Sequence, residues 1–127
     1  MMNYSIFLID DEKVAREGVS LALRNHYHVQ AFETAETAIA ALDDGMPDLV
    51  LLDIGLPGIS GIKALEAMKS RYPDIVVIMN TAFEDIYTVI QAMKLGAYDY
   101  IVKPLKMDAL LVTIKNALDT IAMRKEI

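Results

Sequence analysis

The chain has no cysteine and no tryptophan among its 127 residues. Without cysteine, a disulfide framework, a thiolate metal site and a cysteine nucleophile are all excluded. Basic residues are also few, since 12 lysine and arginine residues stand against 18 aspartate and glutamate residues, for a net charge of −6. Because clustered basic residues are needed to bind phosphate backbones, we expect no nucleic-acid surface within this domain.

Long hydrophobic runs are absent as well. The apolar N-terminal run stops at Asp10 and follows no basic segment, so it is too short for a signal peptide or a membrane span. We therefore expect no membrane association and a cytoplasmic location. Hydrophobic residues still make up 54% of the chain, and its length is that of one ordinary domain, so residues 1–127 are expected to form a single core.

Short β-branched runs alternate five times with helical patterns, as expected for βαβ units around a parallel sheet. Asp11 is expected to cap the first helix, and the polar second strand is expected at an edge of the sheet. The sequence thus predicts an α/β fold, a flavodoxin-like doubly wound (βα)5 three-layer sandwich with strand order 2-1-3-4-5. The expected strands are 6–9, 28–32, 49–53, 75–79 and 98–102, and the expected helices are about 13–25, 35–42, 61–71, 85–95 and 107–125.

Polar residues stand where four of the expected strands end: Asp10 and Asp11, Asp53, Thr81, and Lys103. In open parallel sheets, ligands bind beyond the carboxyl ends of the strands, where the strand order reverses. With the expected order, that point lies between the first and third strands. Each residue alone is explained as a cap, a turn residue or a solvated lysine, but their shared placement predicts one functional site.

Carboxylates crowded into one site repel one another unless a cation lies between them. Mg²⁺ is the natural candidate, with Mn²⁺ as an alternative, because it prefers octahedral oxygen ligands. We expect Asp11 to be a direct ligand and Asp10 a ligand through water. Asp53 is central and best placed to attack phosphorus and form an aspartyl phosphate. Lys103 would neutralise the phosphoryl oxygens, and Thr81 would donate a hydrogen bond to one of them.

Several segments together resemble the receiver domain of bacterial two-component response regulators, over nearly the whole chain. They are Ile9-Asp-Asp-Glu12, the stretch from Leu51 to Gly61, Thr81-Ala82, and the stretch from Gly96 to Pro104. The resemblance implies a switch that takes a phosphoryl group from a sensor histidine kinase and controls an output domain or partner, with transcription as the expected output. Such a domain is not a separate enzyme, because it catalyses only its own phosphoryl transfer and dephosphorylation.

The resemblance also implies roles for single residues. Thr81 and Tyr100 would form a switch pair, although packing explains Tyr100 equally well. Their movement would alter the face built from the fourth helix, fifth strand and fifth helix, through which a phosphorylation-induced homodimer is expected. The metal ligands that it implies are Asp10, Asp11, Asp53 and the backbone carbonyl of Gly55.

Gly55 departs from the receiver pattern, in which this position usually carries a side chain that helps to set the phosphoryl lifetime. Phe83, two residues after Thr81, is the other residue expected to control the access of water. We therefore expect a site that is shielded on the Phe83 side and open on the Gly55 side.

The last expected helix, about 107–125, carries an apolar stripe at Leu111, Ile114, Leu118 and Ile121. Core packing explains this spacing at least as well as a dimer seam. The helix is also expected to continue into a linker to an output domain outside this chain.

Three other functions are alternatives to a phosphorylated switch. A phosphatase of the haloacid dehalogenase type needs a second aspartate two residues after the nucleophile, where Gly55 stands. A flavodoxin-like electron carrier is disfavoured, because the acidic residues from Asp10 to Glu12 would repel a flavin phosphate. A receiver-like interaction module that acts without phosphorylation stays open as the alternative, although all the acceptor-site residues are retained.

Overall fold

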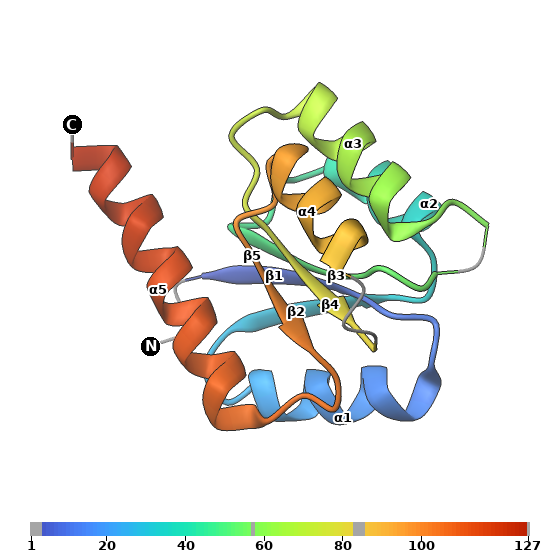
Figure 1. Cartoon of the computed structure of the whole chain (residues 1–127). Coiled ribbons are helices and arrows are strands. Elements are labelled where there is room, and N and C mark those ends of the chain that lie inside the picture. Colours follow the sequence, from blue (N-terminus) through green and yellow to red (C-terminus); the bar gives the residue numbers. More distant parts are fainter. Residues whose placement is uncertain (1–3, 57, 83–85, 127) are drawn as a thin grey trace.

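The computed structural model describes residues 4–56, 58–82 and 86–126, and strands alternate with helices along them (Figure 1). All neighbouring strands are parallel, and their order is β2-β1-β3-β4-β5, which confirms the predicted fold. The strands are β1 (Ser5–Ile9), β2 (His28–Phe32), β3 (Leu49–Asp53), β4 (Val77–Thr81) and β5 (Asp99–Val102). The helices are α1 (Lys13–Leu23), α2 (Ala35–Leu42), α3 (Gly61–Arg71), α4 (Ile86–Lys94) and α5 (Met107–Glu126).

Helices cover both faces of the sheet, so its central strands are buried on both sides (Figure 1). On one face, side chains of α2, α3 and α4, such as Met68, form an apolar cluster with strand residues such as Leu52. On the other face, α1 and α5 form a second cluster in which Leu51 packs with Leu23 and Ile114. Full burial of each such side chain stabilises the fold by about 1.5–3 kcal/mol, and the strand ends are thereby held in fixed register.

Several helix ends follow directly from local sequence. The Thr34 and Ser60 side chains cap α2 and α3, because each accepts a hydrogen bond from a backbone N–H in the first turn. After α4, Gly96 adopts a φ of 103°, a left-handed conformation that glycine takes without steric cost. Local capping bonds and one left-handed glycine therefore define these helix ends.

The predicted start of α1 is partly wrong. Glu12, not Asp11, occupies the N-cap position, and its side chain makes no capping hydrogen bond. Asp11 stands one residue too early to cap, and its carboxylate lies beside those of Asp10 and Asp53. The helix also ends at Leu23, two residues before the predicted end.

The predicted bounds of β4 are wrong by two residues. The backbone N–H of Ile75 donates to the carbonyl of Tyr72 in a turn, and pairing with β3 and β5 continues to the polar end of the strand. Asn80 and Thr81 therefore lie inside β4 and not after it. The polar character of this pair suggested a strand end, but both residues are buried.

The apolar stripe of α5 serves the core. Ile114 and Leu118 are buried, and Leu111 and Ile121 pack against the same cluster, which confirms core packing as the explanation of the spacing. Whether α5 leads to an output domain stays a prediction. Within the described residues, no helix has both the length and the hydrophobicity that crossing a bilayer requires.

Candidate functional site

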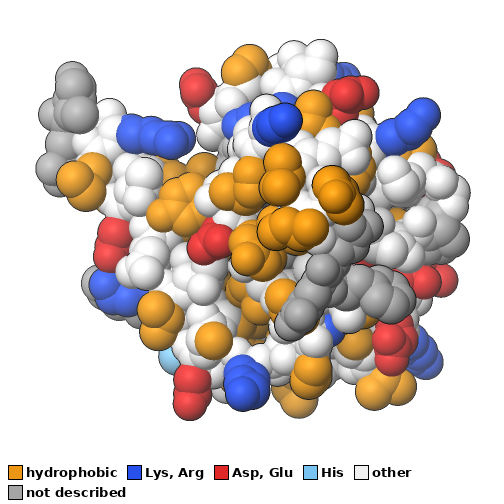
Figure 2. Space-filling model, viewed as in Figure 1, with side chains coloured by type: hydrophobic (Ala, Val, Ile, Leu, Met, Phe, Trp, Pro, Cys, Tyr) orange, Lys and Arg blue, Asp and Glu red, His pale blue; other side chains and the backbone are white. Residues whose placement is uncertain are grey.

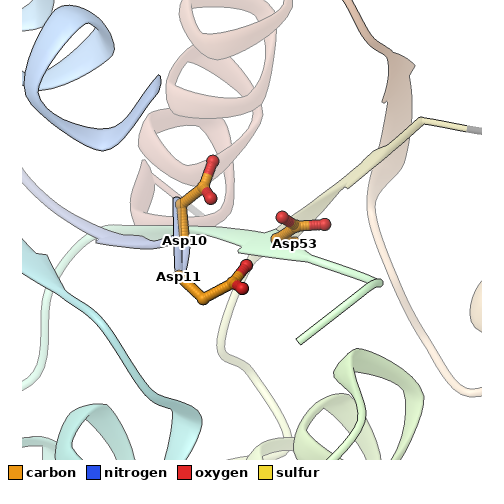
Figure 3. Close-up of side chains that lie close together, drawn as sticks. All are labelled: Asp10, Asp11 and Asp53. Carbon is orange, nitrogen blue, oxygen red and sulfur yellow. The ribbon is translucent and has the colours of Figure 1, made fainter. Parts of the chain in front are cut away.

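The acidic cluster expected from the sequence forms at the carboxyl ends of β1 and β3. Asp10 and Asp11 follow β1, Asp53 ends β3, and the two strands are direct neighbours. Each aspartate offers one carboxylate oxygen, and these oxygens lie within 4.8 Å of one another (Figure 3). Asp10 and Asp53 are buried, whereas Asp11 is exposed. Two fixed carboxylates and one that is free to adjust therefore face the same space.

Hydrogen bonds hold Asp10 in place. Its Oδ1 accepts from the backbone N–H of Glu12 at 2.9 Å, and its Oδ2 accepts from Lys103 Nζ at 3.3 Å. Its backbone carbonyl accepts from Arg16 Nη1 at 2.8 Å. Burial raises the pKa of Asp10, and the bond from Glu12 and the charge of Lys103 offset that rise only in part.

Lys103 reaches from the end of β5 to the acidic cluster. Its Nζ donates to Asp53 Oδ2 at 2.8 Å, and the other Asp53 oxygen accepts from the backbone N–H of Gly55 at 3.0 Å. Burial alone would lower the pKa of Lys103, but the bond to Asp53 and the charges of Asp53 and Asp10 raise it. The ammonium is therefore charged at neutral pH. The backbone N–H of Lys103 donates to the Thr81 carbonyl, which fixes the start of this side chain beside β4.

The donor set suits a hard divalent cation. Oxygens around one octahedral Mg²⁺ lie roughly 3.0–4.2 Å apart, because each is about 2.1 Å from the metal. The observed separations of up to 4.8 Å exceed this range only slightly, and the exposed Asp11 side chain is free to close the difference. Both Asp10 oxygens already accept hydrogen bonds, which suits contact through water.

Gly61, the first residue of α3, is a site residue whose role the sequence did not indicate. Its backbone N–H donates to the carbonyl of Ile54 at 3.1 Å. A Cβ at this position would lie 2.5 Å from Ile54 Cα and closer still to the Asp53 carbonyl oxygen. Glycine therefore lets α3 pack directly on the backbone of Asp53. A glycine at the first helical position was the available signal.

The remaining predicted residues lie around this centre. Thr81 ends β4 and is buried, and Tyr100 in β5 is 40% exposed. Among the described residues, a Cβ on Gly55 would meet only Asp53 Oδ1, at 3.7 Å, so a side chain fits there. Phe83 lies outside the described residues. The switch roles of Thr81 and Tyr100 and the access roles of Gly55 and Phe83 stay predictions.

Comparison with known families decides what this site belongs to. The response regulator receiver domain family matches residues 6–115, which include every residue of the cluster and Lys103. The chain belongs to this family. The resemblance found in the sequence is thereby confirmed, and the chain is a receiver domain, a signalling switch of response regulators.

This receiver domain is similar to parts of longer regulatory proteins. It is 38% identical to the regulatory protein AtoC of Escherichia coli K12, over 96% of this chain and 27% of AtoC. It is 33% identical to the nitrogen assimilation regulatory protein NtrX of Azorhizobium caulinodans, over 99% of this chain and 28% of NtrX. The chain thus spans about a quarter of the length of these relatives.

A solved receiver domain matches the structure closely. The receiver domain of NtrX from Brucella abortus superposes with a TM-score of 0.86 at 36% identity, and the match covers 91% of this chain and 98% of that one. Both receiver domains therefore share the same arrangement of strands and helices.

Proposed function

We propose that this receiver domain accepts a phosphoryl group on Asp53 from a phosphohistidine of a sensor kinase, and that the change acts on an output domain or partner. The observation that carries the proposal is the 2.8 Å contact from Lys103 to Asp53 inside the acidic cluster. In the reaction, an Asp53 carboxylate oxygen forms a bond to phosphorus, the N–P bond of the donor breaks, and the donor imidazole takes up a proton.

The chain's own groups have distinct tasks in this reaction. Asp53 is the nucleophile, and Lys103 provides a fixed positive charge for the phosphoryl oxygens. Burial and backbone bonds hold Asp10 and Asp53 in place, so little reorganisation is needed during transfer. Mg²⁺, with Mn²⁺ as an alternative, would neutralise phosphoryl charge while held by Asp11, Asp53 and the Gly55 carbonyl, with Asp10 bound through water.

An apolar surface over α4 and β5 supports transmission of the signal. Hydrophobic side chains gather on this face of the molecule (Figure 2). We propose that Thr81 and Tyr100 change position on phosphorylation and alter this surface, which then contacts an output domain or a second copy of the chain. The exposed hydrophobic residues of α4 and β5 are Ile86, Tyr87, Ile90, Met93 and Tyr100, and each is at least 40% exposed.

A groove beside the site supports docking of a partner protein such as the kinase. It has a volume of about 610 Å³ and lies between α1 and the segment that joins β5 to α5. Its walls include the site residues Asp10 and Lys103 and apolar residues such as Val14, which is 80% exposed. The regulatory relatives favour transcription as the output of the whole protein.

Incubation with acetyl phosphate and Mg²⁺, followed by intact mass measurement, tests the proposal. The wild type is expected to gain one phosphoryl group, whereas Asp53→Asn and the wild type with excess chelator gain none. A wild type that stays unmodified with acetyl phosphate and with other small phosphodonors would instead support an interaction module that acts without phosphorylation.

A further inference from the structure

Asn80 in β4 is fully buried, and neither its Nδ2 nor its Oδ1 has a hydrogen-bond partner within the part of the chain that the structure describes. Leaving a buried amide unpaired opposes folding, and asparagine is also a poor strand former. The preceding residues of the strand, Val77 to Met79, are apolar. A polar side chain that lowers stability at this position calls for a functional explanation.

The sheet register places Asn80 beside Asp53. Asp53, Asn80 and Ile101 are paired across β3, β4 and β5 and so form one row, with neighbouring strands about 4.8 Å apart. Side chains alternate between faces along a strand. Asn80 follows Ile78 by two residues and Asp53 follows Leu51 by two, and both Ile78 and Leu51 belong to the α1 and α5 cluster. Asn80 and Asp53 therefore share a face.

The side chain of Lys103 crosses that same face. Lys103 starts at the end of β5, yet its Nζ contacts Asp53 of β3 and Asp10 beyond β1. Because β4 lies between β5 and β3, the lysine side chain passes over β4 at its carboxyl end, where Asn80 is located. An ammonium has three N–H donors, and Asp53 and Asp10 accept two of them. An acceptor for the third is what the Asn80 amide offers.

We propose that Asn80 is a positioning residue for Lys103, and this proposal rests on the proposed phosphorylation of Asp53. When the bond to phosphorus forms, the Asp53 oxygen involved becomes the bridging oxygen of a mixed anhydride, and the carboxylate loses its charge. Lys103 then turns toward the phosphoryl oxygens and loses the contact that holds it in the resting state. The Asn80 carbonyl accepts the third N–H during this movement, and because it is neutral it holds the ammonium without cancelling its charge.

The test compares two buried, unpaired polar groups. Asn80→Leu removes the amide and keeps the number and branching of the side-chain heavy atoms. Because leucine is larger than asparagine, the smaller Asn80→Val, which suits a buried strand, is measured beside it. The matched control is Ser20→Ala, because Ser20 Oγ is also buried and unpaired but lies in α1, beside a separate hollow with Leu21 and Arg24. All three variants are expected to melt at or above the wild-type temperature.

Phosphorylation of these variants by acetyl phosphate with Mg²⁺ gives the first readout. The Asn80 variants are expected to react at least about tenfold more slowly, which is the lower end of the effect expected for one hydrogen bond to a charged group. Ser20→Ala is expected to react at the wild-type rate. Stable Asn80 variants that react as fast as the wild type would overturn the inference while leaving the proposed function intact. A wild type that forms no adduct would overturn both.

A double-mutant cycle with Lys103→Met gives the second readout, which a purely structural role of Asn80 would not produce. If Asn80 acts through Lys103, Asn80→Leu slows the reaction in the wild-type background and adds nothing in the Lys103→Met background. An equal slowing in both backgrounds would show that Asn80 acts by another route and would overturn the inference.

Discussion

Replacing Gly61 by alanine places a methyl group where the backbone after β3 already lies. The new Cβ would stand 2.5 Å from Ile54 Cα, and the Asp53 carbonyl oxygen would be closer still. Carbon atoms in ordinary contact are about 3.5–4.0 Å apart. About 1 Å must therefore be gained by moving α3 or the backbone of Asp53, and neither is the flexible end of a side chain.

The cost can be set against the gain in helix propensity. Overpacking of this kind costs about 1–3 kcal/mol, whereas alanine in place of glycine in a helix gains about 1 kcal/mol at most. Because the new Cβ would overlap backbone atoms that cannot turn away, we place the steric cost in the upper part of its range, at about 2–3 kcal/mol. The expected net loss is then about 1–2 kcal/mol. For a chain of 127 residues, the unfolding entropy implies that 1 kcal/mol shifts the melting temperature by about 4 °C. Gly61→Ala is thus expected to melt about 4–8 °C lower.

Two other glycines supply matched controls in the same thermal unfolding assay. Gly18 lies in α1, and a Cβ there would meet no atom of the described residues within 4 Å, so Gly18→Ala should raise the melting temperature by about 2–4 °C. Gly55→Ala places its Cβ 3.7 Å from Asp53 Oδ1, an ordinary contact, and should melt close to the wild type. A Gly61→Ala protein that melts with the wild type or above it would refute the steric reasoning.

Three further predictions concern the phosphoryl lifetime, metal binding and pH. Gly55→Asn should change the phosphoryl lifetime without loss of stability, because a side chain fits there. Lifetimes that stay at the wild-type value in both Gly55→Asn and Phe83→Ala would contradict the proposed control of access. Asp11→Asn should weaken Mg²⁺ binding about tenfold or more in calorimetry, whereas Glu12→Gln, an equal charge change outside the cluster, should not. Equal losses of affinity in both variants would show that only the net charge matters. The hydrogen bond from Tyr72 Oη, together with Arg71, lowers the pKa of Asp43 in the folded protein below its ordinary value of 3.8. The stabilisation that ionised Asp43 provides is therefore present above pH 3.8 and is lost as the pH falls through the lowered pKa of the folded state. The same bond raises the pKa of Tyr72, so Asp43→Asn should bring that pKa back toward 10.0. A phenolate absorbance titration measures it, with Tyr72→Phe as the reference, and an unchanged pKa would exclude the bond in solution.

The elements that the sequence predicted well are those whose side chains share one environment. The bounds of β3 were predicted without error because an apolar run buried on both faces ends in a single aspartate. The bounds of α2 and α3 were predicted equally well, because Thr34 and Ser60 mark their first turns with local capping bonds. Such bonds join residues only a few positions apart, so the local sequence contains all the information they need.

The errors fall where tertiary contacts override local preference. A polar pair at Asn80 and Thr81 suggests the end of a strand, yet pairing with β3 and β5 extends β4 through both residues. Asp11 has a residue type that favours capping, but the backbone places Glu12 at the cap and Asp11 beside Asp53. In both cases the deciding contacts come from residues distant in the sequence.

The sequence by itself determined the chemistry of the site, because the residue types and their places after apolar runs already required carboxylates and one ammonium at the strand ends. Only the tertiary structure decided the contacts between them. Lys103 is 50 residues from Asp53 and 93 residues from Asp10, and the strand order and register bring the three together. The same register places the buried Asn80 beside Asp53. Local sequence could not identify this neighbour, because the two residues lie on different strands.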